Sequence, residues 1–479
     1  MDDLLRASWH RLAGLPGIAQ DALVYLCAAG FAAAVGFLTV GNPDYQTWGK
    51  IALAPYAVAA LVCAVGARGA HAMTPARVSW LRRAVFLSVL VGAVLTPLGA
   101  EMAWRAEAAP GAHAQAEVAV IERAGDRAVH GQDPYLRHPT SAGAAASSDL
   151  SAVDANTFFP YMPGMVSFGI LNALPLPRVL RDARFAFALF TLLVGSIALY
   201  ASGARLSECG RVLQFLVVLP SGALPMVTGG DDLPVVALML LGLVLAQKRN
   251  PVGAGLALGF AASLKFTAWP LVLLLAFAAR DREGRPALGR YSAAVGAVVG
   301  PAVAVGLALQ PAAFVVNVVR FPLGLAKIKS PAASPLLGHF FVDALPAHKT
   351  VVTAALLVLG AAIAIAWLVR YPPRTPAAAA RATAFVMVLA TVLAPATRFG
   401  YLLYPANLLV WAGALPALEA VRTRAPATWR QRLRHGAAAG AAELRQLPTS
   451  LSTTLTSTVL PPAGAVEDAS GSTNTPTSQ

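Results

Sequence analysis

Long apolar runs separated by short, arginine-rich segments dominate this chain. A transmembrane helix needs about 20 consecutive, mainly apolar residues, because the hydrocarbon core is about 30 Å thick and a helix rises about 1.5 Å per residue. The pattern therefore predicts an all-α, polytopic membrane protein with about ten transmembrane helices. The predicted helices are 21–40, 51–67, 84–104, 183–203, 211–228, 232–247, 291–310, 350–369, 380–395 and 399–418.

A further apolar stretch, residues 251–279, is interrupted by Lys265 and Pro270. Its roughly 29 residues suit two half-length helices better than one straight span. We expect a bent helical hairpin that enters and leaves from the same side of the membrane, with Lys265 near its apex. A single tilted crossing would instead move the later basic segments to the opposite side.

The basic segments indicate the orientation of the chain, since cytoplasmic loops are enriched in Arg and Lys. With the hairpin in place, all of them lie on one side, together with the N-terminus. We therefore expect a cytoplasmic N-terminus (1–20), a transmembrane domain (21–418) and a basic, then disordered, cytoplasmic tail (419–479). Two long loops, about 105–181 and 311–349, then face outward from a cytoplasmic (plasma) membrane.

Composition supports the membrane assignment and narrows the chemistry. Only 13% of the residues are charged, against roughly 25% in soluble proteins. The net charge of +14 does not indicate nucleic acid, because the arginines lie in separate loops. Three cysteines form no metal-binding pattern, the spacing of His113, His130 and His138 matches no common zinc site, and no phosphate-binding glycine loop occurs. We expect no metal and no cofactor.

The first outer loop carries the most informative residues. Residues 114–130 have the pattern of an amphipathic helix, and Glu117 and Glu122 on it would lie near the outer membrane surface. A carboxylate there can act as a general base on a hydroxyl, although a solvated helix face is the alternative. Residues 131–135 read as a turn that ends this helix. Phe158–Leu176 is aromatic, apolar and rich in Pro and Gly, which is typical of an interfacial or re-entrant segment.

Charged residues within or beside apolar runs are a second signal, since charge in lipid is costly and tends to be functional. Lys265 lies within such a run and Arg398 at the outer end of another. The second outer loop adds four further candidates, and snorkelling is the alternative for Lys265. These four are Arg320, Lys327, Lys329 and His339.

Two pairs of charged residues receive structural interpretations. Asp231 and Asp232 precede a predicted crossing, where carboxylates favour helix capping. Asp182 and Arg184 are two positions apart and would face each other poorly on a helix. We therefore expect each of them to have a partner elsewhere in the chain.

Several motifs occur in an order that resembles the GT-C-type membrane glycosyltransferases, most closely glycosyltransferase family 87. The resemblance covers about residues 84–415. It rests on Gly131-Gln-Asp-Pro-Tyr135, Phe158-Phe-Pro-Tyr-Met-Pro163, Asp182-Ala-Arg184, Thr228-Gly-Gly-Asp-Asp232, the glycine-rich stretch Gly255 to Lys265, and Pro395-Ala-Thr-Arg-Phe-Gly-Tyr401 with Tyr404-Pro405.

The resemblance implies an inverting enzyme that moves a sugar, most often mannose, from a polyprenyl-phosphate donor to a glycolipid or cell-envelope glycan. Its partners would be these lipids and the surrounding membrane. Glu117 stands where the family usually has an aspartate base, with Glu122 in reserve. The residues implied in donor-phosphate or substrate binding are Lys265, Arg398, Arg320, Asp182, Arg184, Tyr135, Phe158, Tyr161 and Tyr401.

Two other functions remain open on sequence grounds. A transporter or lipid flippase would carry charged residues through the midplane of several helices, often within inverted repeats, and few such residues and no repeat occur here. A non-catalytic protein of the same fold is the other alternative, because Glu117 replaces the usual aspartate.

Overall fold

The computed structural model describes residues 15–39, 41–108, 112–135, 158–203, 210–323, 325, 332 and 334–424. The chain divides into two units, Met1–Arg422 and Thr423–Gln479, and only the first is treated below. The described residues are helical and contain no strand, which confirms the all-α prediction. Eight helices among them are long and apolar enough to cross a membrane. The protein is therefore a multi-pass membrane protein.

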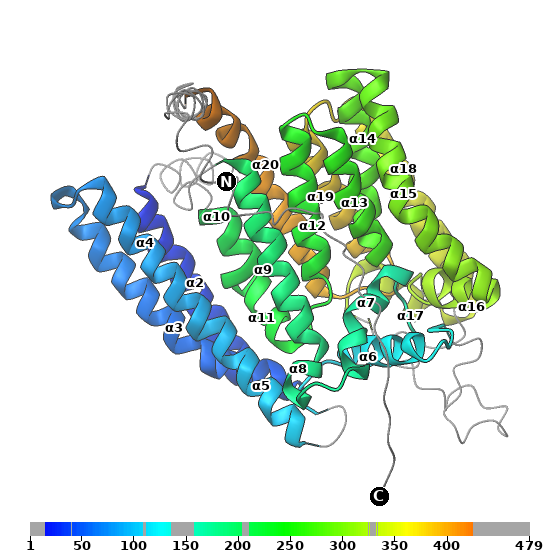
Figure 1. The fold of residues 1–479 in the computed structure, drawn as a ribbon, viewed down its shortest axis with the longest axis horizontal. Helices are drawn as coiled ribbons and strands as arrows, with labels where there is room; N and C mark the ends of the chain where they lie inside the picture. The colour runs from blue at the N-terminus through cyan, green and yellow to red at the C-terminus, as the bar shows by residue number, and fades with distance from the viewer. Residues whose placement is uncertain are drawn as a thin grey trace, which may run out of the picture. The chain divides into compact units, whose positions relative to one another are not determined.

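The first three crossings are two long helices and a third that is interrupted by a π-helical turn. They are α2 (Gly17–Leu38), α3 (Pro43–Arg68) and the continuous stretch α4 (Pro75–Val89), η2 (Leu90–Leu95) and α5 (Thr96–Glu107). Figure 1 shows them packed side by side. Gly36 and Gly49 allow the backbones of α2 and α3 to touch, because a Cβ on Gly49 would lie 2.4 Å from the Gly36 nitrogen. Small residues of this kind are typical of helix contacts in membranes.

The other five candidate crossings, the two helices of the hairpin, and the additional helices α12 and α20 follow the first long loop. They are α9 (Ala183–Ser202), α10 with η7 and α11 (Gly210–Leu213, Gln214–Val218, Pro220–Thr228), α12 (Leu233–Gln247), α13 (Pro251–Leu264), α14 (Trp269–Glu283), α15 (Arg285–Leu309), α18 (Lys349–Arg370), α19 (Pro376–Leu393) and α20 (Leu403–Arg424). Prolines in the first turn mark many of these starts, where the missing N–H costs no helical hydrogen bond.

The predicted hairpin is present as α13 and α14, with Lys265 in extended backbone between them. Gly255 of α13 packs against Tyr291 of α15, and Gly259 packs against Val295. α13 and α15 therefore run parallel, so α14 must return between their ends. This places Lys265 at the apex, as the sequence indicates.

Three of these helices are too short to span the bilayer core. α12, α13 and α14 have 15, 14 and 15 residues, or about 21–23 Å at 1.5 Å per residue. The hydrocarbon core is about 30 Å thick. With their basic ends at Lys248 and Arg280 at one boundary of a bilayer, the opposite ends, at Asp232 and Lys265, would lie recessed from the other boundary.

The long-loop segments are short helices at the end of the bundle where α12 begins and α13 ends (Figure 1). α6 (Ala116–Val129) matches the predicted amphipathic helix. The predicted re-entrant segment is a broken path of short helices. These are η5 (Pro163–Met165), α7 (Val166–Gly169), η6 (Ile170–Ala173) and α8 (Arg178–Arg181), and the second loop forms α16 (Pro311–Val315), η9 (Val316–Arg320), α17 (Leu337–Ala344) and η10 (Pro346–His348).

α6 is held against α7 by a direct backbone contact. A Cβ on Gly125 would lie 2.1 Å from the carbonyl carbon of Gly169, so no larger side chain fits at this crossing. The turn after α6 also matches prediction: Gly131 has φ +70°, and Asp133 accepts a hydrogen bond of 2.9 Å from the Tyr135 nitrogen. These contacts fix the orientation of the helix that carries Glu117 and Glu122.

Candidate functional site

Glu122 is the more buried acid of α6, and its carboxylate is fully engaged. Its two oxygens accept hydrogen bonds of 2.8 and 2.7 Å from the Arg105 guanidinium. One oxygen also accepts a bond of 3.0 Å from the backbone N–H of Ala183. A bidentate Arg–carboxylate pair of this kind is strong and geometrically fixed. Glu122 therefore ties α6 to α5 and to the start of α9.

Asp182 and Arg184 do pair with each other, so the expectation that they would not was wrong. Arg184 donates hydrogen bonds of 3.0 and 2.7 Å to the two carboxylate oxygens of Asp182. The reason is that Asp182 is the N-cap of α9 and has extended backbone, so the helical spacing rule does not apply. Each also has the expected distant partner: Arg105 for Asp182, and the carbonyls of His113 and Val227 for Arg184.

The charge of Asp182 is stabilised within this network. Burial alone would raise the pKa of its carboxyl group, but the hydrogen bonds and charges of Arg184 and Arg105 hold that pKa below its usual value. Asp182 therefore stays ionised and links α5, α9 and the segment before α6.

Glu117, in the first turn of α6, forms an ion pair with Arg398, which precedes the short helix η11 (Phe399–Leu402). The Glu117 side chain is 21% exposed and the Arg398 side chain 36% exposed. Both charged groups are thus paired and still reachable from outside the protein. This distinguishes Glu117 from Glu122, whose oxygens are occupied by three hydrogen bonds.

Lys265 lies at the hairpin apex between two aspartates. Its ammonium is 2.9 Å from Asp231 and 2.5 Å from Asp232. The predicted capping role of these aspartates is not observed, since neither side chain caps α12. Lys265 does not snorkel: the residue is only 9% exposed. The lysine and the two aspartates form a buried cluster with one net negative charge.

Aromatic side chains surround this cluster. The Lys265 ammonium lies 5.1 Å from the centre of the Tyr161 ring, a cation–π distance. Tyr404 donates a hydrogen bond of 2.6 Å to Asp232 and accepts one of 2.7 Å from Thr267. Burial raises the pKa of the Tyr401 phenol, on which the charges of Lys265 and Arg398 both act. Tyr401 therefore lies within electrostatic range of both cationic groups.

Electrostatic coupling joins the two ion-pair groups into one site. Burial raises the pKa of Asp231 to about 6; Lys265 lowers it, while the negative charges of Asp232 and Glu117 add to the rise. Burial likewise raises the pKa of Tyr161, with contributions from Asp231 and Glu117. Because the charge of Glu117 acts on both groups, the candidate site comprises Glu117, Arg398, Asp231, Asp232 and Lys265.

Comparisons with known proteins were made on the whole chain. The model of glycosyltransferase family 87 matches residues 159–395. The chain belongs to glycosyltransferase family 87. It is therefore a membrane glycosyltransferase, as its helices and the family together indicate. Searches of curated proteins and of solved structures found no match.

The family match covers part of the site of this family 87 protein. Asp182, Arg184, Lys265 and the two aspartates lie inside the matched residues, whereas Glu117 and Arg398 lie outside them. The match also begins well after residue 84, where the motif resemblance starts. The structure brings Glu117 and Arg398 to the matched part of the chain.

Two other predicted residues belong to an aromatic layer beside the site. Tyr135 donates a hydrogen bond of 2.9 Å to the carbonyl of Tyr161, and its ring contacts Phe159 and Phe314. Phe158 stacks on Phe321, with the ring centres 4.3 Å apart. Their contacts position the segment that carries Tyr161.

The second-loop cations are not part of this charged cluster in the structure. Arg320 ends η9 with an exposed side chain and no ion pair among the described residues. His339 pairs with Asp343 at 3.0 Å. Lys327 and Lys329 lie outside the described residues. The binding role of Arg320 stays a prediction.

Sequence reasoning missed Asp231, Asp232 and Tyr404 as members of the site of this family 87 enzyme. The order of the residues along the chain contained a usable signal. The aspartates precede α12 and Lys265 follows α13. Because these consecutive helices are joined at their basic ends, their other ends lie close together. The capping interpretation considered only the helix that follows the aspartates, so it overlooked a partner at the end of the next helix.

Proposed function

We propose that this enzyme transfers a sugar, with mannose as the first choice, from a polyprenyl-phosphate donor to a lipid or glycan acceptor. The reaction is an inverting single displacement on the outer face of the plasma membrane. The observation that carries the proposal is the ion pair Glu117–Arg398, a partly exposed carboxylate with a cation, within electrostatic range of the Lys265 cluster. A donor phosphate on a lipid chain would need cations close to the membrane boundary, because its chain stays in the bilayer.

Glu117 is the proposed base. Two observations support this assignment. The carboxylate of Glu122 is held by Arg105 and Ala183. The carboxylate of Glu117 is held by one arginine and remains partly exposed. The acceptor hydroxyl attacks the anomeric carbon as Glu117 takes its proton. The bond from the anomeric carbon to the phosphate oxygen breaks, and polyprenyl phosphate leaves with that electron pair.

Arg398 and Lys265 are the proposed partners of the donor phosphate. Positive groups fixed near a departing phosphate stabilise the charge that develops on it. Arg398 pairs with Glu117 when no phosphate is bound; donor binding would draw the arginine away and release the carboxylate. In this scheme donor binding prepares the base, so the acceptor is activated only when a sugar is present.

The orientation of the proposal rests on the positions of the charges. Lys248, Arg249 and Arg280 lie at the opposite ends of α12, α13 and α14 from the site. Under the positive-inside rule these ends are cytoplasmic. In a cysteine-free variant, a cysteine at Asp126 should react with an impermeant maleimide in whole cells. A cysteine at Arg249 should react only after permeabilisation, and the reverse pattern would overturn the outward-facing site.

The test of function is transfer of labelled mannose from polyprenyl-phosphate mannose into membrane lipids. Wild type should transfer, Glu117→Gln should lose transfer, and Asp126→Asn should not differ from wild type, because Asp126 is a half-exposed acid on the same helix. Equal transfer in Glu117→Gln and wild type removes Glu117 from the mechanism. No transfer by wild type removes this donor and favours transport or a non-catalytic role.

A further inference from the structure

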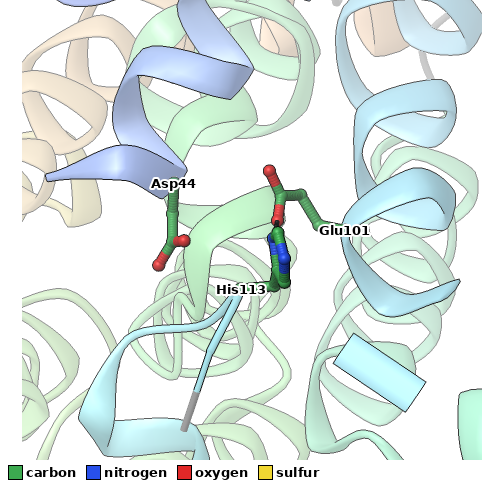
Figure 2. A group of neighbouring side chains, drawn as sticks. All are labelled: Asp44, Glu101 and His113. Carbon is green, nitrogen blue, oxygen red and sulfur yellow. Dashed lines mark hydrogen bonds and ion pairs between the residues drawn. The ribbon is translucent and has the colours of Figure 1, made fainter. Parts of the chain in front are cut away.

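Three side chains outside the proposed site converge from separate parts of the chain. Asp44 comes from the first turn of α3, Glu101 from α5, and His113 from the loop before α6 (Figure 2). One potential ligand atom from each lies within 4.8 Å of the others. In Figure 2 the Glu101 carboxylate lies against the His113 ring, and Asp44 faces both from the neighbouring helix.

The two carboxylates are incompletely paired within the ranges that the structure describes: Glu101 is buried with one oxygen unpaired, and Asp44 is half-buried. Glu101 is completely buried; one oxygen contacts Nδ1 of His113 at 3.0 Å, and the other is buried with no hydrogen-bond partner among the described residues. Asp44 has no hydrogen bond or ion pair from its side chain in the described part of the chain. A buried carboxylate without a partner costs several kcal/mol or neutralises. A cation between them would remove this cost.

Arg184, whose charge acts on both carboxylates, does not fill that role. Arg184 directs its guanidinium to Asp182 and to the carbonyls of His113 and Val227. Its bond to His113 instead fixes the backbone of that residue, which has φ +58°. A non-glycine residue in this conformation costs about 1–3 kcal/mol. The conformation directs the imidazole toward Glu101.

We propose that Asp44, Glu101 and His113 bind a divalent transition-metal ion such as Zn²⁺ or Mn²⁺. Two carboxylate oxygens and one imidazole nitrogen suit such ions, with water completing the coordination. Metal–ligand bonds of about 2.0–2.2 Å place tetrahedral ligand atoms about 3.4 Å apart. Side-chain movements of about 1 Å would bring these three groups to that separation.

The position of this site indicates a role in holding the site helix. His113 precedes Glu117 by four positions, and Gln115 between them donates hydrogen bonds to Tyr45 and Thr228. A metal ion would join α3 and α5 to the segment from which α6 starts. It would thus link the first helices, which lie outside the family match, to the base. It makes no direct contribution to the sugar transfer.

The first measurement is metal content. Full-length protein, purified in detergent, is stripped with a chelator, incubated with Zn²⁺ or Mn²⁺ alone, desalted and analysed by mass spectrometry of its metals. Wild type should retain about one ion per chain, while His113→Ala and Asp44→Asn should retain none above background. His130→Ala is the matched control, since His130 is an exposed histidine that pairs with Asp126 on α6, outside the proposed metal site.

The second measurement, the melting temperature, distinguishes loss of metal binding from misfolding of a variant. Zn²⁺ should raise the melting temperature of stripped wild type and of His130→Ala, and leave that of His113→Ala unchanged. Variants are compared only as monodisperse protein. No retained ion in wild type, or equal retention in wild type and His113→Ala, overturns the proposal and leaves a charged His113–Glu101 pair as the explanation. Neither measurement depends on sugar-transfer activity, so the metal-site proposal and the proposed function are tested independently.

Discussion

Glu117 and Arg398 form an ion pair although 281 positions separate them in the chain. The pair joins the first turn of α6 to the segment before α20, on either side of the residues matched by the family model. It places the proposed base and a cation for the donor phosphate in direct contact. The first prediction follows from this contact.

Arg398→Gln should lower sugar transfer roughly 10²-fold, the usual effect of removing one group that stabilises developing negative charge. Arg398→Lys should retain more activity, since it keeps the charge and loses the planar donor geometry. The measurement is the rate of transfer at saturating acceptor in membranes of matched expression. Arg290→Gln, at the exposed basic end of α15, is the control; transfer unchanged in Arg398→Gln contradicts the donor-binding role.

Lys265→Gln should destabilise the protein by about 3–5 kcal/mol, the usual cost of removing one partner from a buried charge group. The reason is that Asp231 and Asp232 would face each other without a cation. The triple variant Lys265→Gln, Asp231→Asn and Asp232→Asn should lose less stability, because no buried charge remains unpaired. Denaturation of detergent-purified protein gives both values. A triple variant less stable than Lys265→Gln would argue against this explanation.

The raised pKa of Asp231, about 6, predicts a pH effect on stability. A carboxyl group that binds its proton more tightly when folded stabilises the fold at low pH, and this contribution is lost as pH rises toward 6. The melting temperature of wild type relative to Asp231→Asn should therefore fall between about pH 4 and pH 6. Parallel melting curves of the two proteins across that range would show that Asp231 keeps an ordinary pKa.

Gly125→Ala should separate α6 from α7, since its methyl carbon would lie 2.1 Å from the Gly169 backbone. The overlap cannot be relieved by a side-chain rotation. Overpacking of this kind costs about 1–3 kcal/mol or more. We expect a lower melting temperature and weaker sugar transfer, since Glu117 moves with α6. Gly99→Ala, on α5 with open space around it, should differ little from wild type in both assays.

The sequence by itself determined the transmembrane helices, the hairpin and the helix that bears Glu117. These follow from local rules: lipid forces the backbone into helices, and hydrophobic length and basic loops then predict where they cross. α12 is an exception, because its run of apolar residues does not reveal that the helix, with 15 residues, is too short to span the bilayer core. Lys265 was identifiable for the same local reason, as a charge within an apolar run.

Only the tertiary structure decided how the charged residues combine. Glu117 and Glu122 are equivalent acids on one helix by sequence, yet one contacts Arg398 and the other is enclosed by Arg105 and Ala183. Asp44 is distant in sequence from His113, and Glu101, 12 positions before His113, lies on another element, so no local spacing rule places the three together. The physical reason is that partners of buried charges are set by helix packing, which brings residues together without regard to their separation along the chain.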